Sequence, residues 1–191
     1  VRATILVSLV DVVAAEFAVN TETSSVQNRP QAAALQGGGW IVVWRSVAQD
    51  EGGNSGVYGQ RYDASGAAQG GEFLVNQNTA GAQDVGAVVG LTGGGFVVVW
   101  TDGSGLDGSG AGVYARRYDG AGVASGDAFL VNDRVGGTQN AAAATALPDG
   151  GFMIAYTEGS VFDGSGSGVA AQRYAADGSR VDGSLLVNEQ T

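Results

Sequence analysis

The stretch GGGFVVVWTDGSGLDGSGAGVYARRYD (residues 93–119) joins an apolar run to a tyrosine-bearing segment through a loop of Asp, Gly and Ser. The apolar run, residues 96–100, shows no alternation of polar and apolar side chains, which is typical of a strand buried on both faces. Residues 112–118 have the composition of a second strand, and the glycines between the two segments favour turns. The stretch therefore predicts two strands joined by a polar loop.

The same pattern occurs twice more, at residues 37–63 and 149–175. Aligning the three stretches places Trp44, Trp100 and Tyr156 in register, at intervals of 56 residues. A segment that ends in Val-Asn follows each stretch, and a further copy ends at Asn20. A fixed period of this length is the signature of a repeat architecture, in which each unit buries its apolar face against its neighbours. We expect three units, at about residues 21–76, 77–132 and 133–188, within a repeat region of residues 16–191.

Each unit contains four short segments that predict strands, which in the first unit are residues 31–36, 40–44, 56–63 and 72–76. Four antiparallel strands in 56 residues have the size of a β-propeller blade, whose central strands are sandwiched between neighbouring blades. The predicted fold class is therefore all-β, with tandem four-stranded antiparallel sheets that resemble propeller blades. A β-sandwich and a β-solenoid are the alternatives.

Residues 1–15 lie outside the repeat and are rich in β-branched side chains, which favour a strand that joins subunits or domains. A cleaved signal peptide is the alternative. No membrane span is expected, because Arg2 and Asp11 interrupt the segment and a span needs about 20 apolar residues.

The Val-Asn segment occurs four times, but there are only three sets of partner strands, so that one strand is left without a sheet of its own. An unpaired apolar strand pairs readily with the edge of another sheet. Self-association into a homo-oligomer or a filament is therefore predicted, through apolar side chains of residues 1–20, namely Val1, Ile5, Val7, Leu9, Phe17 and Val19.

The composition excludes most familiar catalytic machinery. The chain has no Cys, His or Lys, which removes thiol and Schiff-base chemistry, Ser-His-Asp triads and the usual zinc ligands. Paired carboxylates remain, but the acidic residues recur in step with the repeat, whereas a hydrolase site needs one unrepeated set. We therefore expect that the protein is not an enzyme. Its formal charge of −10 repels phosphates, so nucleic acids are not expected partners.

The loop between the second and third strands of each unit offers oxygen ligands on a glycine-rich backbone, which is the set that Ca²⁺ prefers. Asp-Gly-Ser runs are also ordinary hairpin turns, and this interpretation stays open. Ca²⁺ is the one cofactor predicted, and its candidate ligands in the three loops are Asp50, Glu51, Asp102, Asp107, Ser109, Glu158, Asp163 and Ser165.

The motif F-x-V-N, the Gln at residues 27, 83 and 139, the G-G-[WF] before the apolar run, D-G-S-G-x-G and V-x-x-[QR]-R-Y together resemble a known repeat. They are similar to the tandem repeats of very large, acidic, secreted bacterial adhesins of the type I secretion, RTX-like group. This resemblance covers residues 16–191 and implies a secreted or cell-surface location and an adhesive or calcium-binding, non-enzymatic function. The sequence lacks the glycine-aspartate nonapeptide of the RTX calcium roll, so that motif does not support calcium here.

These observations predict an extracellular structural or adhesive repeat protein that self-associates through its N-terminal strand. One alternative is a fragment of a giant calcium-dependent adhesin. Another is a multivalent propeller that binds a glycan or cell-surface ligand. Trp44 and Trp100 are the aromatic candidates for a glycan site, although their place in the apolar run favours the core.

Overall fold

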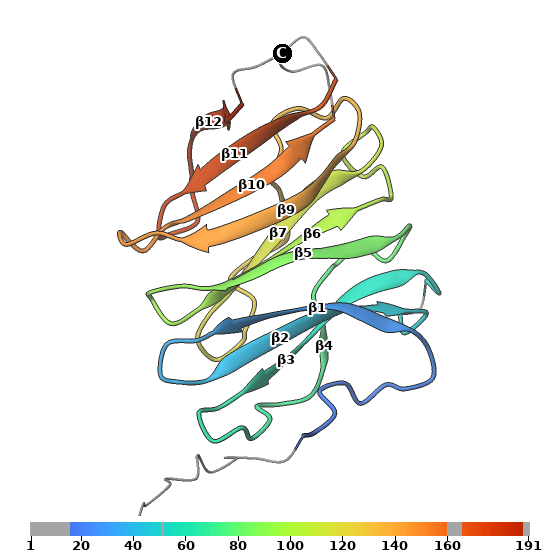
Figure 1. Ribbon diagram of the computed structural model, residues 1–191, viewed down its shortest axis with the longest axis vertical. Helices are drawn as coiled ribbons and strands as arrows, with labels where there is room; N and C mark the ends of the chain where they lie inside the picture. Colours follow the sequence, from blue (N-terminus) through green and yellow to red (C-terminus); the bar gives the residue numbers. More distant parts are fainter. Residues whose placement is uncertain (1–15, 51, 160–165, 189–191) are drawn as a thin grey trace, which may run out of the picture.

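The computed structural model describes residues 16–50, 52–159 and 166–188, which form three four-stranded antiparallel sheets stacked face to face (Figure 1). We call the sheets blades 1, 2 and 3. Blade 1 contains β1 (Gln27–Ala34), β2 (Trp40–Val47), β3 (Ser55–Tyr62) and β4 (Phe73–Leu74). Blade 2 contains β5 (Gln83–Gly90), β6 (Phe96–Asp102), β7 (Gly112–Tyr118) and β8 (Phe129–Leu130). Blade 3 contains β9 (Gln139–Ala146), β10 (Phe152–Glu158), β11 (Gly168–Tyr174) and β12 (Arg180–Leu186).

The strands pair in chain order within each blade, which confirms the predicted all-β fold of tandem four-stranded sheets. The first strand of unit 1 begins earlier than the sequence indicated, at Gln27 rather than at residue 31, because Gln27 and Asn28 still pair with β2 beyond Pro30. Proline donates no backbone hydrogen bond, which an edge strand with an irregular register tolerates. The register of β5 and β9 against their partners also shifts, so each first strand carries a bulge.

The second strand of the middle blade contacts both neighbouring blades. Phe96, Val98 and Trp100 belong to the apolar cluster between blades 1 and 2. Val97 and Val99 belong to the cluster between blades 2 and 3. None of these five side chains is more than 2% exposed, which confirms the predicted burial on both faces.

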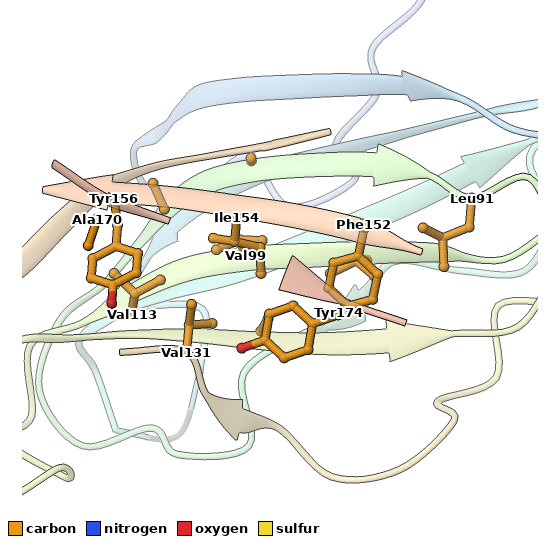
Figure 2. Packing of buried hydrophobic residues seen from close by; sticks show 13 residues of the cluster. Leu91, Val99, Val113, Val131, Phe152, Ile154, Tyr156, Ala170 and Tyr174 are labelled. Atoms are coloured by element: carbon orange, nitrogen blue, oxygen red, sulfur yellow. The ribbon is translucent and has the colours of Figure 1, made fainter. Parts of the chain in front are cut away.

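A group of three aromatic rings fills each contact between blades. The rings of Phe152 and Tyr174 lie next to each other (Figure 2) and stack with centroids 4.7 Å apart. The ring of Phe129 in blade 2 lies 5.2 Å from that of Tyr174. Phe96, Tyr118 and Phe73 form the same group between blades 1 and 2. Burial raises the pKa of Tyr118 to about 12.

An Asn and a Gln tie each blade to the next. Asn132 Oδ1 accepts a hydrogen bond from the Val113 backbone N at 2.8 Å, and its Nδ2 donates to Gln139 Oε1 at 3.2 Å. Asn76 makes the same bonds to Val57 and Gln83, at 2.7 and 3.4 Å. Asn76, Asn132 and both glutamines are at most 2% exposed. The recurring Asn therefore bonds backbone groups and also connects the end of one blade to the first strand of the next.

Residues 17–21 contact blade 1 in the same way that the end of blade 1 contacts blade 2. Phe17 packs on Tyr62 with ring centroids 5.4 Å apart, and the Tyr62 hydroxyl donates to the Val19 carbonyl at 3.2 Å. The Thr21 backbone N donates to the carboxylate of Glu72. The ring contact and the tyrosine hydrogen bond recur 56 residues later, between residues 73–75 and blade 2, where the Ala128 backbone N also donates to Gln77 Oε1. The segment thus occupies the place of a fourth strand in a preceding blade.

The side chains predicted to mediate self-association divide into two groups. Phe17 and Val19 contact blade 1 of their own chain. The others, Val1, Ile5, Val7 and Leu9, lie outside the described residues, so self-association through residues 1–20 stays a prediction. In the part of the chain that the structure describes, no helix is long and apolar enough to cross a membrane.

Candidate functional site

A groove lies beside the first strands of all three blades. β5 contacts both β1 and β9, so these strands follow one edge of the stack. The groove has a volume of about 400 Å³, and we call it the first-strand groove. Its walls are Arg29 of blade 1, Asp84, Val85, Gly86, Thr101 and Ala111 of blade 2, and Thr138, Asn140 and Ala141 of blade 3.

Asp84 is the acidic residue of the first-strand groove and lies between two guanidinium groups of blade 1. Arg29 Nη1 donates to Asp84 Oδ2, and Arg45 Nε lies 3.8 Å from Asp84 Oδ1. The Arg29 side chain is 60% exposed and that of Asp84 33%, while Asp84 Oδ1 itself is buried and accepts no hydrogen bond from the described residues. The groove therefore presents a carboxylate beside an accessible cation.

The backbone of the groove has two residues in an unusual conformation. Arg29 and Ala141 have φ angles of 54° and 50°, in the left-handed region. They hold the same place in units 1 and 3, next to the bulges of β1 and β9. Side chains other than glycine seldom adopt this region, and both such residues and bulges concentrate where a fold orients side chains for function. The bulges thus set the walls of the groove.

The side chains at the groove do not repeat, although the strands do. One repeat position carries Asn28, Asp84 and Asn140 in the three blades, and the next carries Arg29, Val85 and Ala141. The groove thus gathers Arg29, Asp84 and Asn140 from equivalent strands of the three blades, whereas Asn28 lines the pocket beside Trp44. The acidic residues that recur in the loops gave no indication of this set, because it lies on the first strands.

The two tryptophans considered for a glycan site lie in the core. Trp44 is 3% exposed and Trp100 2% exposed. Trp44 lines a pocket of about 180 Å³ together with Val19, Asn20 and Asn28, on the face of blade 1 turned away from blade 2. The sequence interpretation that favoured the core for both rings is confirmed.

The candidate calcium ligands fall into separate environments. Asp102 and Glu158 are buried at strand ends, where Asp102 accepts from the Ser104 backbone N at 2.9 Å and Glu158 accepts from Gln139 Nε2 at 2.8 Å. Asp107 accepts from the Ser109 backbone N at 3.1 Å, within the loop. Glu51, Asp163 and Ser165 lie outside the described residues. Among the residues that are described, no group of three or more acidic side chains could hold a metal ion.

Two solved structures share the fold of this chain. An endo-arabinase from Bacteroides thetaiotaomicron VPI-5482 is 15% identical, with a TM-score of 0.50 over 83% of this chain and 61% of its own. An α-L-arabinofuranosidase from Lactobacillus brevis is 12% identical, with a TM-score of 0.53 over 86% of this chain and 55% of its own. The fold is propeller-like. This chain spans little more than half the length of either enzyme, and no family model and no curated protein sequence matches it.

The expectation that the protein is not an enzyme is wrong. Both of these structural neighbours are enzymes by name, so a fold of this kind supports catalysis in other proteins. The physical reason lies in the first strands, where a repeated backbone brings Arg29, Asp84 and Asn140, a set that does not recur from unit to unit, to one groove. Acidic residues that recur in loops therefore do not exclude a single site elsewhere on the blades.

Proposed function

We propose that the protein binds carbohydrate in the first-strand groove. The observation that carries this proposal is the convergence of polar side chains from three blades on one cavity of about 400 Å³. Small-molecule sites commonly have volumes of about 300–1,000 Å³ and contain a few placed polar groups on a less polar surface. The groove has this composition, since Val85, Gly86, Ala111 and Ala141 separate its polar groups.

The polar groups of the groove match the chemistry of sugar hydroxyls, each of which both donates and accepts hydrogen bonds. The carboxylate of Asp84 accepts, the guanidinium of Arg29 donates, and the amide of Asn140 does both. Hydrogen bonds to charged groups are shorter and stronger than those between neutral groups. Asp84 and Arg29 are therefore the expected anchors of the ligand.

Arabinose-containing polysaccharides are the first ligands to test, because two enzymes that share the fold are named for arabinose-containing substrates. Glycoside hydrolysis commonly uses two carboxylates, one on each side of the bond. The described lining of the groove supplies one, Asp84. An assay for hydrolysis, which measures the release of reducing ends from the polysaccharide, therefore accompanies the binding measurement.

Replacing Asp84 by Asn is expected to weaken carbohydrate binding by about tenfold or more, because a hydrogen bond to a charged group contributes about 1.5–3 kcal/mol. Affinity electrophoresis on arabinan and on other plant and bacterial polysaccharides selects the ligand, and calorimetry then gives Kd. The control is Asp119→Asn, which removes a carboxylate from an exposed turn of the same blade. Equal affinity of wild type and Asp84→Asn for the selected ligand would contradict the proposal.

Calcium binding in the Asp/Gly/Ser loops is a second proposal, supported by carboxylate oxygens without partners. Asp107 Oδ2 and both carboxylate oxygens of Asp50 are buried and accept no hydrogen bond from the described residues. A β-carbon at Gly112 would lie 2.8 Å from Asp107 Oδ2, so the glycine leaves room for the carboxylate. Buried anionic oxygens of this kind favour a cation.

Millimolar Ca²⁺ is therefore expected to raise the thermal midpoint of unfolding, because a ligand that binds only the folded chain stabilises it. Asp107→Ala should reduce the increase, whereas Asp119→Ala, in an exposed turn, should leave it unchanged. Differential scanning calorimetry with Ca²⁺ and with a chelator measures both. An identical midpoint in the two buffers would rule out the calcium proposal.

Secretion, a cell-surface location and adhesion are further proposals for this chain. They are supported by the resemblance of its motifs to the repeats of secreted adhesins and by its net negative charge. Carbohydrate binding in the first-strand groove is compatible with each of them, because extracellular adhesive proteins meet polysaccharides outside the cell.

A further inference from the structure

The outer face of blade 3 has the same side chains that blades 1 and 2 bury against the next blade. Val57 of blade 1 and Val113 of blade 2 are 0% exposed, whereas Val169, at the same place in blade 3, is 42% exposed. The equivalent residues at the ends of the fourth strands show the same contrast, at 0%, 0% and 54% exposed for Val75, Val131 and Val187. Blade 3 therefore exposes an apolar contact surface, and no blade formed by the described residues packs against it.

The last arginine of the third strand marks the same surface. Arg61 of blade 1 donates to the backbone carbonyls of Gly120 and Ala121, in a turn of blade 2. Arg117 of blade 2 donates in the same way to the turn of residues 176–177 in blade 3. Arg173, the equivalent residue of blade 3, instead pairs with Asp149 of its own blade at 2.5 Å. Its side chain is 48% exposed.

The complementary surface is on blade 1. Trp40 and Tyr62 occupy the places of Phe96 and Tyr118, which blade 2 packs against blade 1. Residues 17–21 cover this surface in part, and Phe17 itself remains 51% exposed. The turn of residues 64–65 in blade 1 corresponds to the turn in blade 2 that accepts hydrogen bonds from Arg61.

We propose that the outer face of blade 3 binds blade 1 of a second copy of this chain, so that copies stack head to tail. In the contact, Arg173 donates to the carbonyls of residues 64 and 65 of the second copy, and residues 185–188 take the place that residues 17–20 hold within that copy. Residues 17–21 thus compete with the incoming chain for blade 1.

The occupant is a second copy of the chain, because the contact continues an interface that the chain already makes twice. The same apolar positions and the same arginine recur at both internal contacts, between blades 1 and 2 and between blades 2 and 3. Blade 3 exposes Leu185 and Val187 as well. A head-to-tail contact of this kind leaves a free face at each end and continues to longer assemblies.

Sedimentation velocity of the full chain over a concentration series tests the proposal. Val169→Asp places a charge in the contact and is expected to weaken association by about tenfold or more. Val123→Asp is the matched control, since Val123 is a 62% exposed valine in a turn of blade 2, and it should associate like wild type. Circular dichroism verifies that both variants keep the fold.

Phe17→Ala distinguishes this contact from strand exchange through the N-terminal segment. The variant loosens residues 17–21 from blade 1 and is expected to strengthen head-to-tail association, whereas an assembly built by residues 1–20 would weaken. Stronger association of Phe17→Ala that Val169→Asp reverses supports the proposal. Weaker or unchanged association of Phe17→Ala, or association that is insensitive to Val169→Asp, overturns it.

Discussion

Replacing Phe96 by Ala is expected to lower the free energy of unfolding by about 3–5 kcal/mol, the usual loss for a large aromatic side chain removed from a core. Phe96 is 0% exposed and stacks on Tyr118 with ring centroids 4.8 Å apart, between blades 1 and 2. Its removal leaves a cavity that both blades line. Equilibrium unfolding in urea, followed by tryptophan fluorescence and circular dichroism, measures the loss.

Trp40 provides the matched control, because it holds the same place in blade 1, on the face turned away from blade 2. It stacks on Tyr62 at 5.5 Å and is only partly buried. Trp40→Ala should cost about 2 kcal/mol or less, although the ring removed is larger. Equal losses for the two variants would show that contact between blades is not what buries Phe96.

Asn132→Ala is expected to destabilise the protein by about 3 kcal/mol or more. The substitution leaves the Val113 backbone N, the Arg134 carbonyl and Gln139 Oε1 without their hydrogen bonds to Asn132. An unsatisfied buried polar group costs about 1–3 kcal/mol. The same urea experiment measures the change.

Asn188→Ala is the control for Asn132→Ala, since it removes the same motif residue from blade 3. Asn188 accepts from the Val169 backbone N at 2.6 Å, at an exposed position. Water can replace that bond, so a loss of about 1 kcal/mol or less is expected. A loss at Asn188 as large as that at Asn132 would indicate that the motif acts within one blade, and not between two.

The sequence predicted the blades because their determinants are local and periodic. Residues 96–100 are apolar at every position, which only a strand with neighbours on both faces can accommodate. The interval of 56 residues then fixed the number of units. The early start of β1 was missed, because a proline at residue 30 usually ends a strand and the pairing of Gln27 beyond it depends on the opposite strand.

The groove could not be predicted in the same way. Asp84 lies in a first strand that reads as part of the scaffold, and its proximity to Arg29 depends on how two blades stack. Asp102 and Glu158 illustrate the opposite case. Their place beside a glycine-rich loop suggests calcium ligands, whereas the register of their strands buries both side chains. Periodicity specifies the backbone of a repeat, whereas the proposed binding site depends on the positions where side chains depart from the period.

The arginine contacts between blades give the molecule a direction. Arg61 and Arg117 each bond the unit that follows in the chain, and the Asn-to-Gln bonds run the same way. At both contacts between blades, the arginine of the earlier blade thus donates to a turn of the later blade. Duplication or loss of a whole unit in the gene would leave matching surfaces at the new contact between blades. The number of blades can therefore change in steps of 56 residues without any change to the surfaces that meet.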